Sequence, residues 1–510
     1  MSIRGKVLSS SLWLVTETGA TMLSSFIVFA LMTRLLQPID FGLVAFAALF
    51  IDFARGLMSD SIPGALVQRR TWDEDAASTA FWMHIGSALL FVAAVAALAV
   101  PLANTYGSAR LAAVFLALSA SIVVDAMRGL HEAKLRREFG YKQLAIRTVI
   151  ASLVSGIAGV AMAFAGFGVW ALVANRLMSS ALQTIIVVVA VRWRPKLLFS
   201  KTECAALFRF GRDMVGAVLF AQLNGRIAEL AIGFVLGPVD LAFFRVGSRA
   251  IGFLMQVGIN PIRYTALSAF SRLGNAPSIA SAYLRMTRST ALLSFPLFLG
   301  AAAVAPDFVV VCFGRQWEPS GAIMMALGFG AAPATLLYFV QPALTALGRT
   351  RLILNFSFVT LVLNAIAALA TVKLGVVAVT AGQTARAYIT VPFALNILQK
   401  VIGLPMVQTV RSIAEPGIAA SVMAAVVFVA RLYALDSLSP LVRLLLCVAL
   451  GAVVYAGLLL IVGRRHLSEV MRELIPHLPA GARAAAEWVV QRIQTRTPAA
   501  SPFADIAGKY

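Results

Sequence analysis

The feature that most restricts how this chain can fold is a series of long apolar segments separated by short polar breaks. A helix needs about 20 apolar residues to cross the hydrocarbon core of a bilayer. Fourteen segments approach that length, and we expect each to be a transmembrane helix. They cover residues 8–33, 41–67, 77–101, 110–130, 144–165, 168–191, 210–235, 240–263, 288–313, 320–346, 351–371, 374–397, 416–434 and 439–463.

Composition supports the same class. Hydrophobic residues make up 60% of the chain and charged residues only 13%, which predicts an all-α polytopic membrane protein. The net charge of +21 would indicate nucleic acid in a soluble protein. In a membrane protein, the positive charge comes from Lys and Arg enriched on the cytoplasmic side, where they attract anionic lipids. We therefore expect membrane lipids and no nucleic acid as partners.

The charged loops predict the orientation. Clusters such as Lys134, Arg136 and Arg137 alternate along the chain with loops that hold single cations such as Arg110 and Lys373. By the positive-inside rule, both termini are then cytoplasmic. The basic start before the first apolar segment indicates a retained transmembrane helix rather than a cleaved signal.

A short motif is repeated 200 residues apart, as Leu36-Gln37-Pro38-Ile39-Asp40 and Leu236-Gly237-Pro238-Val239-Asp240. The alternatives are a common helix-hairpin turn that arose twice and a fold built by doubling, as in many transporters. Doubling predicts two parallel six-helix lobes related by a pseudo-two-fold axis, at 1–195 and 196–400. Two additional helices (401–463) and a cytoplasmic tail (464–510) complete the predicted organisation, with 192–212 as the inner linker.

The tail has two open interpretations. The segment Leu467–Gln494 is either an amphipathic helix on the inner surface, with Leu474, Trp488 and Ile493 as apolar anchors, or a partly ordered tail.

Several predicted helices carry ionisable or amide side chains at membrane depth, where such groups tend to face a partner or a cavity. The polar residues within 210–235 lie along one face of that predicted helix, and those within 240–263 lie along one face of theirs. These residues are Glu17, Asp52, Arg55, Gln222, Arg226, Glu229, Arg245, Arg249 and Gln256, with Asn224 nearby in the sequence.

Each charged group has two interpretations, a clamp between helices or part of a binding site. For Asp125 and Arg128 we favour a clamp, and for Arg226 and Glu229 both remain open. Arg245 and Arg249 are like charges with no acid on their own face, so a neighbouring helix or an anionic substrate must neutralise them, and we favour the substrate. The resulting central cationic cavity would suit a phosphorylated ligand, because guanidinium groups match phosphate oxygens.

The chain also resembles the Wzx-like polysaccharide-transport flippases of the multidrug/oligosaccharidyl-lipid/polysaccharide exporter superfamily. The resemblance is carried by Arg34–Gly42 with Ala65–Arg69, Phe210-Gly211, Gly237-Pro238, Ala269–Leu273 and Ala343–Arg349. It implies a MATE-like fold of two six-helix lobes plus two helices. It also implies translocation of undecaprenyl-pyrophosphate-linked oligosaccharide repeat units across a bacterial inner membrane, for exopolysaccharide, capsule or O-antigen biosynthesis.

On this hypothesis Arg55, Arg245 and Arg249 hold the pyrophosphate, with Arg226 in the same site. Gln222, Asn224 and Gln256 then hydrate the sugars, and Glu17, Asp52 and Glu229 are candidates for ion coupling. A polysaccharide polymerase and a chain-length regulator are candidate partners. We expect no catalytic residue, metal or cofactor, since the three cysteines are scattered without a metal-ligand spacing.

Three other functions are alternatives. A peptidoglycan lipid-precursor flippase would bind a similar headgroup. A cation-coupled drug exporter would favour acids in its pocket, whereas this interior is rich in arginine. A membrane polymerase or glycosyltransferase would show a sizeable outer loop or an acidic nucleotide-sugar motif. The outer loops here are short, and we interpret the acidic run Asp73-Glu74-Asp75 as a solvated loop.

Overall fold

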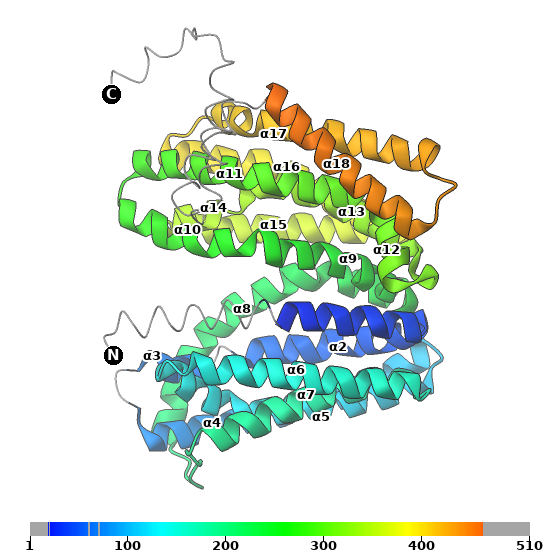
Figure 1. Cartoon of the computed structure of the whole chain (residues 1–510). Helices are drawn as coiled ribbons and strands as arrows, with labels where there is room; N and C mark the ends of the chain where they lie inside the picture. Colours follow the sequence, from blue (N-terminus) through cyan, green and yellow to red (C-terminus); the bar gives the residue numbers. More distant parts are fainter. Residues whose placement is uncertain (1–18, 20, 60–61, 70–71, 463–510) are drawn as a thin grey trace. The chain divides into compact units, whose positions relative to one another are not determined.

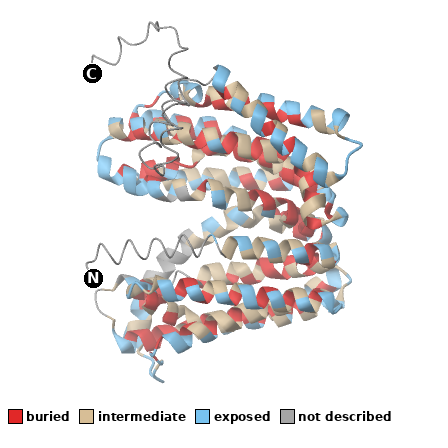
Figure 2. Ribbon diagram, in the orientation of Figure 1, coloured by how far each residue is buried: buried red, intermediate tan, exposed pale blue. Residues whose placement is uncertain are grey.

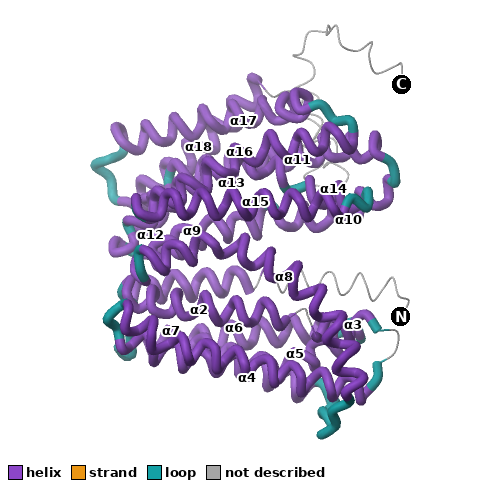
Figure 3. The backbone as a smooth tube through the Cα atoms, turned by 180° about the vertical axis from the view of Figure 1, so that it is seen from behind, coloured by secondary structure: helices purple, strands orange, loops and turns teal. Residues whose placement is uncertain are grey.

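The computed structural model describes residue 19 and residues 21–59, 62–69 and 72–462. These residues are almost entirely helical, and no strand occurs among them (Figure 3). A helix Thr21–Leu35 comes first. The elements that follow are α2 (Pro38–Ser59), α3 (Ile62–Gln68), α4 (Glu74–Thr105), α5 (Ala109–Arg137), α6 (Tyr141–Phe164), α7 (Val169–Ala190), α8 (Lys201–Val235), α9 (Pro238–Gly258), α10 (Asn260–Leu273), α11 (Ala276–Ala303), α12 (Ala305–Phe313), η1 (Arg315–Trp317), α13 (Pro319–Ala334), η2 (Thr335–Leu337), α14 (Val340–Ala346), α15 (Thr350–Thr371), η3 (Val372–Leu374), α16 (Val376–Ile402), α17 (Met406–Val429), η4 (Ala430–Ala434) and α18 (Pro440–Val462) (Figure 1). Glu17 and the predicted tail 464–510 lie outside the described residues.

The prediction of a polytopic helical membrane protein is confirmed. Ten helices in the described part of the chain are long and apolar enough to cross a membrane, or up to eleven if α11 and α12 form one broken span. The predicted number of fourteen is not confirmed. The segments 240–263 and 374–397 do form helices, but Arg245 and Arg249 in the first, and Gln383 and Arg386 in the second, lower their hydropathy.

The repeated motif begins a helix in both copies. Pro38 is the first residue of α2 and Pro238 the first of α9, where a missing backbone N–H costs nothing and the φ of proline suits a helix. Asp40 and Asp240 lie in the first turns, where a negative charge opposes the positive end of the helix dipole.

The two copies of the motif also touch. A Cβ added at Gly42 of α2 would overlap the backbone carbonyl of Pro238. One helical turn further, Phe46 is fully buried and lies against Gly233 of α8. The Tyr106 hydroxyl donates a hydrogen bond of 2.8 Å to the carbonyl oxygen of Gly233. Small residues therefore let the start of α2 approach the turn between α8 and α9 closely.

The chain separates into two compact units. The first unit contains the residues up to Val257, with Ala305–Gly330 and Arg349–Thr390, and the second contains Gly258–Val304, Ala331–Gly348 and the chain from Val391 on. In both, buried residues follow the helix faces that meet (Figure 2). The division into lobes at 1–195, 196–400 and 401–463 stays a prediction.

The second unit is held partly by polar groups. The hydroxyl of Tyr283 on α11 donates to the carbonyl oxygen of Leu336 at 2.5 Å, and the Ser294 and Thr335 hydroxyl oxygens are 2.8 Å apart. Both contacts are buried, so they give hydrogen-bond partners to polar groups that water does not reach.

We predict that Gly42→Ala destabilises the protein by about 1–3 kcal/mol, because the added methyl group overpacks the contact with Pro238. The measurement is loss of folded protein on heating in detergent. Gly86→Ala is the matched control: it lies inside α4 with nothing within 4 Å of an added Cβ, so it should leave stability unchanged or raise it. Equal melting of the two variants would contradict the close contact.

Candidate functional site

A cavity with a volume of about 840 Å³ lies inside the first unit. It is lined by the helix Thr21–Leu35 and by α2, α6, α7, α8 and α9. Its charged lining residues are Asp52, Arg176, Arg226, Glu229, Arg245 and Arg249. Among the residues that the structure describes, four arginines thus face two carboxylates, an excess of two positive charges, and we call this the arginine cavity.

Two arginines of the cavity have carboxylate partners on other helices. Arg245 of α9 donates to Glu229 Oε2 of α8 through both Nε, at 3.2 Å, and Nη2, at 2.7 Å. Arg176 of α7 forms an ion pair with Asp52 of α2. A neighbouring helix therefore neutralises Arg245, which is the first of the two alternatives that the sequence left for this residue.

The remaining two arginines are less compensated. Arg226 Nη1 lies 3.8 Å from Asp52 Oδ2, and the same carboxylate already pairs with Arg176. Arg249 donates to the hydroxyl of Ser25, and its guanidinium carbon lies 5.4 Å from the centre of the Phe29 ring. Within the described part of the chain Arg249 forms no ion pair with a carboxylate. The positive excess is therefore concentrated at Arg226 and Arg249.

An aromatic cluster lies beside the arginine cavity. Phe29 and Phe41 line the cavity, and Phe41 meets the ring of Trp317 edge-on at 5.2 Å. Trp317 is fully buried, and its Nε1 donates to the carbonyl oxygen of Thr33 at 2.7 Å. Gln316 Nε2 donates to the carbonyl oxygen of Leu36 at 2.9 Å. We call this set of contacts, between η1 and the end of the helix Thr21–Leu35, the Trp317 contact.

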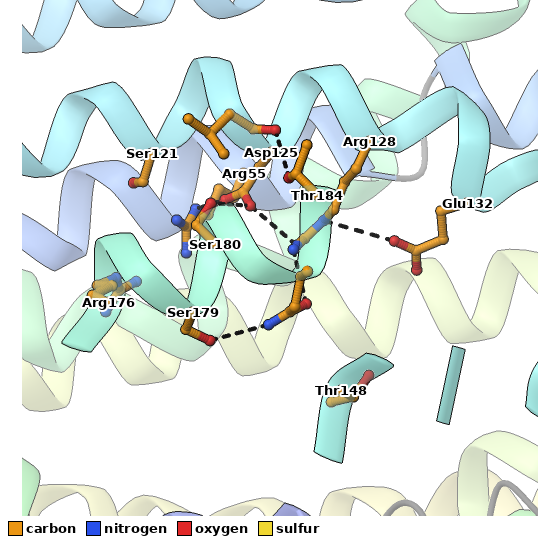
Figure 4. Close-up of polar contacts among 12 residues, drawn as sticks. Arg55, Ser121, Asp125, Arg128, Glu132, Thr148, Arg176, Ser179, Ser180 and Thr184 are labelled. Carbon is orange, nitrogen blue, oxygen red and sulfur yellow. Dashed lines mark hydrogen bonds and ion pairs between the residues drawn. The ribbon is translucent and has the colours of Figure 1, made fainter. Parts of the chain in front are cut away.

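A second, smaller cavity of about 260 Å³ lies between α2, α3, α4 and α5, and Arg55 lines it. Arg55 Nε lies 2.5 Å from Asp125 Oδ2, and Arg128 Nη2 lies 3.2 Å from Asp125 Oδ1 (Figure 4). Ser180 of α7 donates to the same carboxylate at 2.6 Å. Asp125 therefore links three helices.

Glu132, about two turns further along α5, extends this network. It lies 3.0 Å from Arg147 Nη1, 2.9 Å from Arg136 Nη2 and 3.8 Å from Arg128 Nε. Arg128 also donates to Gln183 Oε1 at 2.8 Å. Because both carboxylates are surrounded by guanidinium groups, the network is built to hold α2, α5, α6 and α7 together. The clamp that the sequence favoured for Asp125 and Arg128 agrees with this arrangement.

The structure brings six of the sequence-predicted site residues to the arginine cavity: Asp52, Arg226, Glu229, Arg245, Arg249 and Gln256. Three others lie elsewhere. Arg55 lines the smaller cavity. Gln222 lies against Gly56 and accepts a hydrogen bond from Arg226. Asn224 contacts Asn364 of α15, which donates to its carbonyl oxygen at 2.8 Å.

Sequence reasoning missed Arg176, which lines the cavity together with Asn175 and Ser25. Arg176 is an ionisable residue inside the apolar segment 168–191, so the signal used for the other arginines applied to it as well. Ser25 and Asn175 carry no such signal, because single hydroxyl and amide groups are common in membrane helices.

Comparison with known proteins finds a matching family, similar proteins and a solved structure of the same fold. The family described as "Polysaccharide biosynthesis protein" matches residues 31–322, more than half of the chain. The chain is 23% identical over 482 residues to the succinoglycan biosynthesis transport protein ExoT of Rhizobium meliloti (strain 1021), over 92% of this chain and 97% of ExoT. It is 24% identical over 480 residues to the teichuronic acid biosynthesis protein TuaB of Bacillus subtilis (strain 168), over 92% of this chain and 99% of TuaB. The solved structure of the lipid II flippase MurJ in an inward closed conformation matches with a TM-score of 0.71 at 14% identity, over 92% of this chain and 100% of MurJ. That likeness shows the fold.

We predict that Asp125→Asn destabilises the protein by about 3–5 kcal/mol, because it leaves Arg55 and Arg128 with an uncompensated charge. Thermal denaturation in detergent measures the effect. Asp436→Asn is the control, since that carboxylate pairs with Arg443 but is 77% exposed, and its loss should cost less than about 1 kcal/mol. Similar melting of both variants would show that the network is not a clamp.

Proposed function

We propose, because this chain belongs to the polysaccharide biosynthesis protein family, that it is a flippase for a lipid-linked oligosaccharide. The substrate is an undecaprenyl-pyrophosphate-linked repeat unit, which moves from the inner to the outer leaflet of a bacterial inner membrane. The name of ExoT refers to succinoglycan biosynthesis and transport, and the name of TuaB refers to teichuronic acid biosynthesis, which supports a polymer-building pathway.

The observation that carries the proposal is Arg249, a guanidinium that lines the arginine cavity and has no carboxylate partner among the described residues. A diphosphate offers several negative oxygens, and each guanidinium can bind two of them in a fork. Arg249 and Arg226 are the two groups whose charge the protein compensates least, so the pyrophosphate binds there first. The volume of about 840 Å³ lies within the range of ordinary ligand sites and holds a headgroup while the prenyl chain stays in lipid.

The two carboxylates of the cavity could exchange their arginine partners when the substrate binds. Asp52 pairs with Arg176, and Glu229 pairs with Arg245. An entering pyrophosphate competes with them for the guanidinium groups, and a displaced carboxylate can bind a proton or a cation. Asp52 and Glu229 therefore remain our candidates for ion coupling.

Outward release needs a path from the cavity to the outer side of the membrane. If both termini are cytoplasmic, as the charged loops predict, the turn that contains Pro38 faces outward. The Trp317 contact lies next to this turn, and in our proposal it closes the outer end of the cavity. Breaking it exposes the arginine cavity to the outside. An inside-negative potential assists the outward movement of an anion by about 2.3 kcal/mol per charge per 100 mV.

A flippase for a peptidoglycan lipid precursor is the second candidate. The fold shared with the lipid II flippase MurJ and a diphosphate-binding cavity both suit it. A cation-coupled drug exporter fits less well, because its cationic cargo would meet an excess of arginine. Membership in the polysaccharide family favours the first candidate.

We predict that Arg249→Ala lowers polymer export at least tenfold, the loss expected from about 1.4 kcal/mol or more of anion binding. Export by the Arg249→Lys variant should lie between that of the parent protein and that of Arg249→Ala, because lysine keeps the positive charge but cannot bind two oxygens in a fork. The assay uses a strain lacking its own copy, with a membrane-impermeant sugar label on spheroplasts to locate lipid-linked units. Lys373→Ala, an exposed residue outside the cavity, is the control.

If Arg249→Ala exports polymer normally at equal protein level, the pyrophosphate site is wrong. If lipid-linked units reach the outer leaflet in a strain without the protein, the flippase function itself is wrong.

We also predict that Gln316→Ala with Trp317→Phe opens the outer end, because it removes the donors to Thr33 and Leu36. The readout is labelling of Ser25→Cys by a membrane-impermeant thiol reagent added outside, after Cys204, Cys312 and Cys447 are replaced by serine. Labelling should rise relative to the same protein with Gln316 and Trp317 intact. Unchanged labelling, in a variant that still exports polymer, would contradict an outer gate at this contact.

A further inference from the structure

The segment between α7 and α8 is not helical, yet it is tightly attached to α4. Residues 191–200 form what we call the linker loop. Trp82 Nε1 donates to the carbonyl oxygen of Lys196 at 2.9 Å. The backbone N–H groups of Lys196 and Ser200 donate at 3.1 Å to the hydroxyls of Ser78 and Thr79 on α4. These bonds give the loop one conformation relative to the first turns of α4.

The base of the loop is also anchored by an aromatic side chain. Trp193 is only 5% exposed and lies between Trp72, at 6.0 Å, and His131, at 5.1 Å, as measured between ring centres. Lys196 pairs with Asp75 at 3.3 Å and Glu74 at 3.5 Å. The hydrogen bond with Asp75 and the two negative charges raise the pKa of Lys196.

Beyond these attachments the loop displays apolar side chains instead of burying them. Leu197 is 93% exposed, Phe199 55% and Leu198 37%. Figure 3 shows the loop extending past the helices α4 and α5. The backbone bonds on either side, at Lys196 and Ser200, prevent these three residues from turning inward. A rigid apolar tip of this kind would be unfavourable in water.

Beside the carboxylates of Glu74 and Asp75, which pair with Lys196, three further cations flank the tip in the sequence. Arg192, Arg194 and Lys201 are exposed, and the structure gives none of the three an ion pair among the described residues. The loop follows the end of the membrane-spanning helix α7 at Ala190, which places it at a membrane boundary. Apolar residues flanked by Lys and Arg at such a boundary are typical of segments that lie in the headgroup region of anionic lipids.

We propose that the linker loop is an interfacial anchor for anionic lipid. Leu197, Leu198 and Phe199 enter the boundary between headgroups and acyl chains, and Arg192, Arg194 and Lys201 bind lipid phosphates. The surface is separate from the arginine cavity, and the proposal does not depend on the transported substrate.

The test uses the full-length protein with Cys204, Cys312 and Cys447 replaced by serine and with Leu197→Cys labelled by bimane. The protein is reconstituted in phosphatidylcholine vesicles with or without phosphatidylglycerol. Phospholipids brominated near the headgroup should quench the bimane, and aqueous iodide should not. Glu138→Cys, exposed in the turn between α5 and α6, is the control and should show the reverse.

The electrostatic part has its own variant. Arg192→Gln with Arg194→Gln should reduce quenching by brominated lipid in vesicles with phosphatidylglycerol and leave it unchanged in phosphatidylcholine alone. Melting at the parent temperature shows that the variant is folded.

Quenching of the Leu197→Cys label by iodide and not by brominated lipid would overturn the anchor, because the tip would then lie in water. Protection from both quenchers would also overturn it, since a protein would then cover the tip. Equal quenching with and without the two arginines would remove the role of anionic lipid. None of these results depends on polymer export, so failure here is distinguishable from failure of the flippase proposal.

Discussion

The cost of holding arginine in a membrane interior governs how the first unit is built. A guanidinium at membrane depth costs at least about 2.5–3.5 kcal/mol unless a partner or a polar cavity receives it. The chain meets this cost with ion pairs between different helices, as in Arg55–Asp125, Arg176–Asp52 and Arg245–Glu229. Each pair fixes two helices relative to one another, so helix packing and charge compensation are the same interaction.

Both clusters hold four arginines and two carboxylates among the described residues, so the partners of each single arginine distinguish a structural network from a binding site. Around Asp125 and Glu132, each carboxylate oxygen has guanidinium or hydroxyl neighbours, and the cavity beside them is small. In the arginine cavity Arg249 has only the Ser25 hydroxyl and the face of Phe29 among the contacts of the described residues. An arginine without a carboxylate partner can bind an anion directly, whereas an arginine of the network would first have to leave the carboxylate that it holds.

The same arginines explain why the helix count from hydropathy was too simple. Helix α9 carries Arg245 and Arg249 on the face that lines the cavity, so it is helical but not apolar enough to qualify as a span. Local rules are expected to fail where a chain does chemistry. The disagreement between apolar length and helix formation therefore falls on α9, which lines the candidate site, and also on α16, which contributes no residue to its lining.

The class, the repeated motif and the family could all be predicted from the order of the amino acids. Long apolar segments require membrane helices, proline suits the helix starts at Pro38 and Pro238, and the resemblance to polysaccharide-transport proteins is confirmed by the family match. Most cavity residues were also identifiable, because charged residues at membrane depth are rare. The pairing of each acid with its arginine emerged only from the folded chain, which joins Arg245 to Glu229, places Arg55 at Asp125 and adds Arg176 to the cavity. Ion pairs between helices depend on how each helix is rotated and shifted along its axis relative to its neighbour. A periodic pattern along one helix gives no information about either.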